Sequence, residues 1–369
     1  MPLTSDRDSI PNFATIPIFC YNLSPMSQRR QVFMNSDGRG IVLLSVAVYS
    51  LLKNSDSSKS LDLYIAHDRT FEEVGGLERI CGIVRKFPFA SVHYLDCGPL
   101  LDKYGPALDN GTHPLMLWAF PLCTEILPPN VTGRIVYIDI DMLIRRDLEP
   151  LFSIDLASGG FIAAAVNESR REHRQYLVDA GWPEEAGYSF NNATCVLDLD
   201  ACRRERIADQ LVSWYLAHKD VAVNLDQDSQ NVIYGARTLR LPVKWNYTDG
   251  WLERILKMNP FAREWRVFPP EDILEAILDP AIVHYIGRKK PTRWTHRPER
   301  RAFRQAMAEL GLLENGRLPD ETNLRILAGW FFDGYHLALK GYVHLLLLVR
   351  RLCGPGRVAS ATNGLVARG

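Results

Sequence analysis

The sequence predicts an α/β fold with a doubly wound, mixed and mainly parallel sheet. Between Gln31 and Lys219, apolar runs of strand length alternate with segments whose apolar residues recur at helical spacing. Such alternation favours parallel strands joined by helices that cover both faces of the sheet. The chain has 369 residues and is 47% hydrophobic, so it is long and apolar enough to bury a full core.

The first third of the chain supplies strands and helices in that order. Residues 1–30 form an irregular arm, rich in proline and serine, with a strand-like run at its end. The stretch RQVFMNSDGRG then predicts a strand and a glycine-containing turn, followed by a helix from Ile41 to Leu52. Further strands are expected over Leu61–His67 and Ser91–Cys97, with a helix in residues 72–87 between them.

The middle of the chain continues the pattern. Buried strands are expected over Gly159–Asn167 and Ser189–Asp200. A helix is expected in residues 201–219, with Asp200 as its N-cap. Past Pro242 the sequence is rich in tryptophan and proline and loses its alternation, which favours an irregular acceptor region.

The end of the chain predicts a separate helical segment. Residues 31–300 form the predicted main domain, and residues 301–369 a C-terminal helical extension. Its helix, over Leu324–Leu352, is apolar and aromatic, but Asp333 and Lys340 interrupt the roughly 20 apolar residues that spanning a bilayer requires. Two alternatives stay open: the helix packs on the domain, or it lies in a membrane interface as a peripheral contact.

Composition excludes several classes of protein. Lysine plus arginine and aspartate plus glutamate both total 43, so no net charge attracts nucleic acid. The seven cysteines are scattered without CxxC spacing, which argues against a disulfide framework and a structural zinc site. The N-terminus shows no basic segment followed by an apolar one, so we expect a cytoplasmic protein.

Two carboxylates, Asp139 and Asp141, follow the strand-like run RIVYI. Residues two apart along a strand point to one side, so the carboxylates would share a face and repel each other without a cation or proton between them. Mg²⁺ and Mn²⁺ suit such oxygen ligands. The spacing alone does not decide, since acidic residues also close a strand into a turn. The same spacing recurs at Asp198/Asp200, which helix capping explains better, and at Asp226/Asp228.

The segment YIDIDMLIRRDLEPLFSIDL resembles the metal-binding segment of glycosyltransferase family 8, the retaining nucleotide-sugar transferases that include glycogenin and bacterial lipopolysaccharide transferases. Four further blocks follow in the order of that family: VFMNSDGRGIVLLSVAVYSLLKNS, SFNNATCVLDLDACRRERI, NLDQDSQNVIYGARTLRLPVKWNY and AIVHYIGRKKPTRW. The resemblance covers Gln31 to Trp294. It implies a Rossmann-like domain of the GT-A type that binds a UDP-sugar donor.

The resemblance also implies roles for individual residues. Asp139, Asp141 and His284 would hold Mn²⁺ or Mg²⁺. Gly287 would let the backbone approach the diphosphate, and Lys290 would neutralise phosphate charge as UDP departs. Without the resemblance, a lone histidine is more often a buried core residue and GRKKP a solvated basic turn.

On the sugar side, the resemblance places Gln227 beside the anomeric carbon and Asp226 near sugar hydroxyls. Asn191 would line the sugar pocket, and Asp37 would contact uracil or ribose. Hydrogen bonding within loops, or capping in the case of Asp37, is the alternative for these residues.

The sequence departs from the family at the donor and acceptor contacts. Phe120 stands where the family usually has an arginine that meets the donor, and Asn167 stands where relatives often carry an aspartate near the acceptor. The metal ligands are all present, so the departures favour unusual sugar specificity or weakened catalysis over a different fold.

The expected function is metal-dependent transfer of a hexose from a UDP-sugar to a hydroxyl of a cell-envelope glycan or glycolipid, with retention at the anomeric carbon. A catalytically impaired nucleotide-sugar or glycan binding module is the main alternative, because the donor arginine is missing. A metal phosphoesterase is a third, although a two-metal site needs more ligands than this one carboxylate pair supplies.

Overall fold

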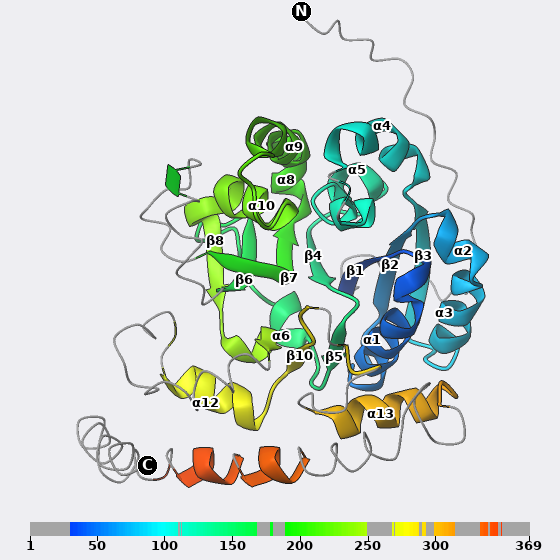
Figure 1. The fold of residues 1–369 in the computed structure, drawn as a ribbon, viewed down its shortest axis with the longest axis vertical. Helices are drawn as coiled ribbons and strands as arrows, with labels where there is room; N and C mark the ends of the chain where they lie inside the picture. Colours follow the sequence, from blue (N-terminus) through cyan, green and yellow to red (C-terminus); the bar gives the residue numbers. More distant parts are fainter. Residues whose placement is uncertain are drawn as a thin grey trace, which may run out of the picture.

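The structure is a computed structural model of the whole chain (Figure 1). It describes residues 30–313 and 333–348, apart from 110, 112, 168–177, 180–188, 249–267, 269, 288–289, 293–298, 339 and 346–347. The predicted strand in the N-terminal arm lies outside the described residues, as do Arg288, Lys289 and Arg293, three basic residues in and just after the GRKKP segment.

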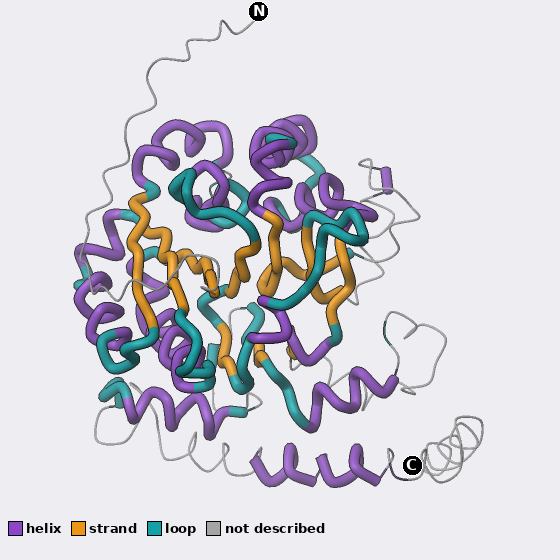
Figure 2. The backbone as a smooth tube through the Cα atoms, turned by 180° about the vertical axis from the view of Figure 1, so that it is seen from behind, coloured by secondary structure: helices purple, strands orange, loops and turns teal. Residues whose placement is uncertain are grey.

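A seven-stranded sheet with the strand order β3-β2-β1-β4-β7-β6-β8 forms the centre of the molecule (Figures 1 and 2). Its strands are β1 (Arg30–Ser36), β2 (Leu61–His67), β3 (Ala90–Asp96), β4 (Arg134–Ile138), β6 (Ala163–Asn167), β7 (Phe190–Asp198) and β8 (Thr238–Leu241). The strands predicted between residues 31 and 200 all form part of it. The prediction of a doubly wound, mainly parallel sheet is confirmed.

Strand β7 is antiparallel to both of its neighbours, whereas β1, β2, β3 and β4 pair in parallel. The carboxyl ends of β4 and β6 therefore lie at the same edge of the sheet as the first residues of β7. The backbone N–H of Asp139, just beyond β4, donates to the Ala193 carbonyl of β7 at 2.9 Å. This edge gathers the residues that the sequence singles out.

Alternate residues of each strand enter two separate cores, which is why helices cover both faces. Val32 and Met34 of β1 join one core, and Phe33 between them joins the other. The first core packs under α1 (Ile41–Lys53) and α3 (Gly76–Val84), and the second under α4 (Gly98–Leu108), α9 (Ile207–His218) and their neighbours. The remaining α-helices are α2 (Arg69–Glu73), α5 (Cys123–Ile126), α6 (Glu149–Phe152), α8 (Leu199–Arg204), α10 (Asp226–Tyr234), α12 (Pro270–Leu278) and α13 (Arg300–Glu309).

Two predicted helices differ from their observed forms. The segment 72–87 contains the end of α2 and the whole of α3, separated at Gly75, whose φ of +70° ends the first helix. The segment after β7 forms α8 and α9, with Arg206 in the left-handed region between them. The expected N-cap was wrong: Asp198 accepts the Ala201 N–H at 2.9 Å, while Asp200 accepts the N–H of Gly133.

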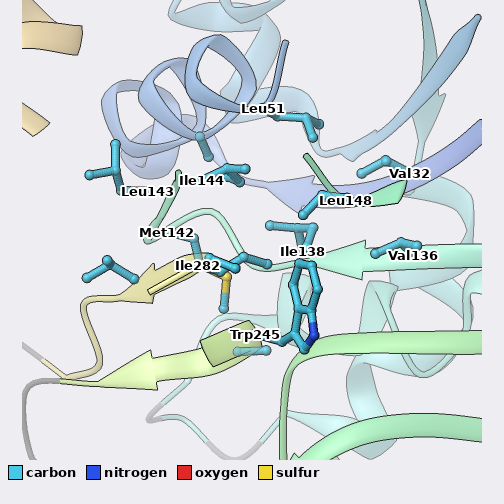
Figure 3. Packing of buried hydrophobic residues seen from close by; sticks show 14 of the residues in the cluster. Val32, Leu51, Val136, Ile138, Met142, Leu143, Ile144, Leu148, Trp245 and Ile282 are labelled. Atoms are coloured by element: carbon cyan, nitrogen blue, oxygen red, sulfur yellow. The ribbon is translucent and has the colours of Figure 1, made fainter. Parts of the chain in front are cut away.

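A second, three-stranded sheet lies beside the first and has the order β5-β10-β9. It consists of β5 (Met142–Ile144), β9 (Tyr247–Thr248) and β10 (Ile282–His284), so it joins segments that are far apart in the sequence. Its residues pack into the first core with Ile138 of β4 and Trp245 (Figure 3). Among these core residues, Ile138 directly precedes Asp139, Met142 directly follows Asp141, and Val283 directly precedes His284.

The C-terminal segment runs along the lower edge of Figure 1. Phe303, Ala306 and Met307 of α13 are buried in the first core. Residues 333–338 and 340–345, within the predicted terminal helix, are helical. No helix of the described part of the chain is long and apolar enough to cross a membrane.

Candidate active site

The two aspartates lie in the tight connection between β4 and β5. Asp139 follows the last residue of β4, and Asp141 precedes the first residue of β5. The carboxylate of Asp139 accepts the N–H of Ile140 at 2.7 Å, which bends the chain at this point. It is this turn, rather than the alternation along a strand that we expected, that brings the carboxylates together.

His284 reaches the same place from the other end of the chain. Strand β10 pairs antiparallel with β5, with His284 opposite Met142, and the Tyr285 N–H donates to the Asp141 carbonyl at 3.0 Å. The imidazole Nε2 then lies 3.3 Å from Oδ1 of Asp141. One ligand atom from each of Asp139, Asp141 and His284 lies within 4.8 Å of the other two. Two short strands thus assemble a cluster with the donor set of a divalent cation site.

The electrostatics of this cluster favour a cation. Burial, together with the charge of Asp141, raises the pKa of Asp139 to about 6. Burial would also raise the pKa of Asp141, but the positive charge of His284, present when its ring is protonated, and that of Lys290 lower it below its ordinary value. Oδ1 of Asp141 is buried and receives no hydrogen bond from the described residues. An orphaned carboxylate oxygen that faces an imidazole nitrogen fits a bound metal ion.

Lys290 sits beside the cluster on the loop that follows β10. Its ammonium group contacts Oδ2 of Asp141 and donates to the Tyr285 carbonyl at 3.0 Å. Gly287, at the turn between them, has a φ of +81°, a conformation that a residue with a side chain adopts only with strain. The loop therefore brings a positive charge into contact with one of the carboxylates of the cluster.

A network of amides lies on the other side of the aspartates. Asp226 and Gln227 begin α10, directly after Leu225, whose φ of +45° is unusual for a branched residue. Asn191 donates its Nδ2 to Oε1 of Gln227 at 2.9 Å, and Asn192 donates its Nδ2 to Oδ2 of Asp226 at 2.7 Å. Both asparagines lie at the start of β7, so a rigid strand holds the polar groups of α10.

Asp226 extends the acidic cluster. Burial, assisted by the charge of Asp139, raises its pKa to about 7, although the hydrogen bond from Asn192 opposes the shift. Three carboxyl groups thus meet at one edge of the sheet. Three carboxyl groups at this separation destabilise the fold unless a positive charge compensates them. Such a cluster is typical of a functional site.

The remaining predicted residues are placed differently. The carboxylate of Asp37 caps the 3₁₀ turn η2 (Gly38–Gly40), accepts from the N–H groups of Arg39 and Gly40, and pairs with the Arg39 guanidinium. Asp37 thus caps this turn, and its contact with uracil or ribose stays a prediction. Asn167 ends β6 opposite Phe190, next to Asn191 in the sheet, and its side chain lies outside the description.

Phe120, at the position of the missing arginine, is an apolar core residue. It is 1% exposed and stacks on Tyr137 of β4 with ring centroids 3.7 Å apart and planes 5° from parallel. The pKa of Tyr137 is raised by burial and by the carboxylates of Asp139, Asp226 and Asp141. An aromatic pair therefore underlies the acidic cluster where a charge was expected.

Two residues of the site were missed by sequence reasoning. Asn192 holds Asp226, and Asn246 donates to Asn191 at 2.7 Å and contacts Nδ1 of His284 at 2.9 Å. The paired asparagines of SFNN were a visible signal for the first. Asn246 had none, because its role depends on β9 pairing with a distant strand.

Comparison with known proteins agrees with this geometry. The model of the family described as glycosyl transferase family 8 matches residues 31–296. The chain belongs to glycosyl transferase family 8. Its sequence is 26% identical over 169 residues to general stress protein A of Bacillus subtilis, across 45% of this chain and 55% of that protein. It is 27% identical over 210 residues to UDP-glucose:glycoprotein glucosyltransferase 2 of Homo sapiens, across 49% of this chain and 14% of that protein. The chain thus spans about half or less of the length of these two relatives.

Solved structures of glycosyltransferases share the fold of this family 8 chain. Galactosyltransferase LgtC, in complex with donor and acceptor sugar analogues, superposes with a TM-score of 0.63 at 19% identity, over 77% of this chain and 97% of that one. The bifunctional glycosyltransferase WbbM superposes with a TM-score of 0.60 at 17% identity, over 78% of this chain and 51% of that one. The fold of this glycosyltransferase is therefore of the GT-A type.

Proposed function

We propose that this glycosyltransferase moves a hexose from a UDP-sugar to a hydroxyl of a cell-envelope glycan or glycolipid, in a metal-dependent reaction with retention at the anomeric carbon. The observation that carries the proposal is the convergence of Asp139, Asp141 and His284 from two strands about 140 residues apart, with Lys290 beside them. A nucleotide diphosphate needs that combination of a cation site and an adjoining ammonium group.

Mn²⁺ or Mg²⁺ would be held by Asp139, Asp141 and His284. When bound, the ion would supply Lewis-acid stabilisation of the departing diphosphate. Lys290 is placed to donate to a phosphate oxygen once the cation neutralises Asp141, the residue that Lys290 contacts in this structure. Gly287 leaves the backbone at the mouth of the cluster without a side chain, so phosphate oxygens can approach the loop.

The state of Gln227 supports retention without a covalent enzyme intermediate. Its Oε1 accepts from Asn191 Nδ2 at 2.9 Å and from the Asn192 N–H at 3.3 Å, so both lone pairs of the oxygen are engaged. A nucleophile would need one of them. We therefore favour displacement on the face of the leaving group: the bond from C1 to the phosphate oxygen breaks, the acceptor oxygen bonds to C1 from that face, and its proton passes to the departing phosphate.

The terminal helix supports contact of this protein with a membrane surface. Its polar residues face the domain: Asp333 accepts from Arg300 at 2.6 Å, and Lys340 donates to Glu299 at 2.6 Å. Its leucines face outward, with exposed fractions of 72% for Leu337, 55% for Leu345 and 53% for Leu348. The helix also buries Val343 in the first core, but a helix that exposes three leucines while its charged residues pair with the domain departs from the usual pattern of a surface helix.

The occupant that this face fits is an anionic bilayer surface. The guanidinium of Arg301, which is 78% exposed, lies at the start of the helix beside Asp333, and RR follows it in the sequence at positions 350–351. Leucines inserted among acyl chains with arginines at the headgroups would place the active site near a glycolipid acceptor.

Turnover decides between transferase and binding module. Purified protein is incubated with Mn²⁺ and a panel of UDP-sugars, with and without glycan and glycolipid acceptors, and UDP release is measured. The proposal predicts release that requires metal and increases with acceptor, and that is lost in Asp139→Asn. Donor binding without turnover would favour the binding module, which the burial of Phe120 in place of a donor arginine supports.

A further inference from the structure

We infer that Asn246 is a positioning residue that fixes the tautomer of His284 and couples it, through one directed chain of hydrogen bonds, to the Gln227 amide. The chain runs from the metal cluster to the sugar side: His284, Asn246, Asn191, Gln227. The inference rests on the proposed function, because it takes His284 as a metal ligand and Gln227 as a group at the sugar.

The direction of the chain is set by backbone N–H groups, which can only donate. The Ala193 N–H donates to Oδ1 of Asn191 at 3.2 Å, and the Asn192 N–H donates to Oε1 of Gln227 at 3.3 Å. Both oxygens are thereby identified as acceptors. The amino group of Asn191 must then be the atom that faces Gln227, at 2.9 Å.

The same logic continues to the histidine. Oδ1 of Asn191 can only accept, so the atom of Asn246 that lies 2.7 Å from it is the amino group. The oxygen of Asn246 is then left to face Nδ1 of His284, at 2.9 Å. An amide oxygen accepts, so Nδ1 carries the proton of the neutral ring and Nε2 carries a lone pair.

This tautomer prepares the cluster for a cation. Nε2 of His284 and Oδ1 of Asp141 face each other at 3.3 Å, each with a lone pair directed into the cluster. A proton donor between them is excluded by the Nδ1–H tautomer, whereas a metal ion accepts electron density from both atoms. An outer hydrogen bond of this kind orients the ligand histidine and raises its basicity.

Burial restricts this chain of hydrogen bonds to one orientation of its amide groups. Asn246 is 2% exposed and His284 3%, so bulk water does not compete for their polar atoms. Trp245 and Tyr247, on either side of Asn246, are buried in the first core, and β9 pairs with β10 so that Thr248 lies opposite His284. Turning the Asn246 amide by 180° would set a donor against the donor Nδ1–H of His284 and an acceptor against the acceptor Oδ1 of Asn191. Both hydrogen bonds of Asn246 would therefore be lost together.

The tautomer is tested directly, without metal or substrate. Protein labelled with ¹⁵N-histidine is recorded in a two-bond ¹H–¹⁵N correlation spectrum in EDTA, at a pH where the imidazole is neutral. The His284 signals are identified by their absence in His284→Gln. The inference predicts a protonated Nδ1 in the wild type and loss of that preference in Asn246→Ala. A protonated Nε2 in the wild type would overturn it.

Metal affinity tests the first half of the chain. Mn²⁺ binding is measured from the electron paramagnetic resonance signal of the free ion. Asn246→Ala is expected to weaken binding by about 10- to 100-fold, the usual cost of removing an outer hydrogen bond to a metal ligand. Asn35→Ala is the matched control. Asn35 is a buried amide (6% exposed) that donates to the Met116 carbonyl at 2.8 Å and does not belong to the chain of hydrogen bonds from His284 to Gln227. The Mn²⁺ affinity of Asn35→Ala should change by less than about twofold, because this variant removes no hydrogen bond to a metal ligand. Wild-type affinity in Asn246→Ala would overturn the inference.

Asn246→Asp separates the two halves. A carboxylate still accepts from Nδ1–H of His284, so Mn²⁺ affinity should be retained. It cannot donate to Asn191 and instead sets an acceptor oxygen against Oδ1 of Asn191. The Asn191 amide and the Gln227 amide bonded to it should therefore shift, and kcat for UDP release should fall about tenfold or more. Unchanged kcat would refute the link to Gln227. If the wild type neither binds Mn²⁺ nor releases UDP, the proposed function fails, and the histidine spectrum still decides the inference. The spectrum and this isosteric variant also suffice if Asn246→Ala does not fold.

Discussion

Gly40 and Ile140 are in direct contact, so the turn after β1 packs on the turn that holds the metal cluster. A Cβ atom on Gly40 would lie 2.4 Å from Cδ1 of Ile140 and 2.4 Å from Oγ of Ser36. Ile140 stands between the two aspartates. A methyl group added at Gly40 must therefore push aside the side chains of Ser36 and of Ile140, the residue between Asp139 and Asp141.

We predict that Gly40→Ala weakens Mn²⁺ binding about tenfold and raises the donor KM, because a misplacement of about 1 Å is costly in a site held by fixed ligands. The backbone of Gly40 has a φ of −82°, so the methyl group strains contacts and not the dihedral angles. The control is Gly82→Ala, where a Cβ meets nothing within 4 Å. Being within helix α3, that change should stabilise the protein by about 0.5–1 kcal/mol without altering Mn²⁺ affinity. Equal effects of the two variants on Mn²⁺ affinity would contradict the prediction.

We predict that Asp226→Asn stabilises the metal-free protein at neutral pH while it lowers activity. The pKa of Asp226 in the folded state, about 7, lies above the ordinary carboxyl value of 3.8. The unfolded chain therefore releases a proton that the folded state retains, and the free energy of unfolding falls as pH rises from about 4 to 7. The amide removes this fall, which should add about 1–2 kcal/mol at pH 7.5.

Urea unfolding in EDTA at pH 4.5 and pH 7.5 measures the effect. The difference between Asp226→Asn and the wild type should be small at pH 4.5 and larger at pH 7.5. Asp228→Asn is not a suitable control, because Asp228 accepts the N–H groups of Val223 and Asn224. A stabilisation that does not depend on pH would show that the carboxyl group of Asp226 is not the cause.

The Phe120 and Tyr137 pair predicts that the missing arginine cannot simply be restored. Phe120→Arg places a guanidinium at a position that is 1% exposed, and we expect a loss of about 3 kcal/mol or more. Phe120→Leu keeps an apolar side chain and loses the stacked ring, for about 1–2 kcal/mol. Urea midpoints of the two variants give the comparison. An arginine variant as stable as the wild type would mean that this position opens to the donor.

The outward leucines of the terminal helix predict a membrane contact that can be removed without unfolding the protein. Replacement of Leu337, Leu345 and Leu348 by glutamate should abolish flotation with anionic liposomes, because insertion depends on apolar area and on attraction to headgroups. Tm should change little, since more than half of each side chain is already exposed.

Val74→Glu is the matched control for this surface, as Val74 is 50% exposed between α2 and α3. It should leave flotation unchanged. Binding should also fall with added salt and be weak to zwitterionic liposomes. Flotation of the triple variant at the wild-type level would refute the contact, and concentration-dependent dimers of the wild type that the triple variant lacks would assign the leucines to a second copy of the chain.

Local patterns predicted the elements that are long and one-sided. The strand over Leu61–His67 is buried at all seven positions, and the alternation of strands with helices was enough to predict the doubly wound sheet. The direction of β7 was not predictable in this way, since an apolar strand carries no mark of parallel or antiparallel pairing. The breaks at Gly75 and Arg206 were missed because helical spacing continues across them.

The site residues were predictable only where the strands that carry them were predictable. The two aspartates follow a strand that the sequence shows clearly, so their position at the edge of the sheet was predictable. The contact of His284 with Asp141 depends on β5 and β10, strands of three residues that no local pattern could identify. The resemblance to a family supplied that contact in advance. It could not supply Asn246, whose importance depends on hydrogen-bond direction.

The reversed direction of β7 has a consequence for how the protein can change. A parallel strand ends at the ligand edge, so its site residues sit on the loop that follows and move when that loop changes. Asn191 and Asn192 are the second and third residues of a strand that begins at this edge, and Asn191 lies opposite Val166 of β6. The amides that hold Asp226 and Gln227 can therefore keep their places in the sheet while the loops at this edge of the sheet vary.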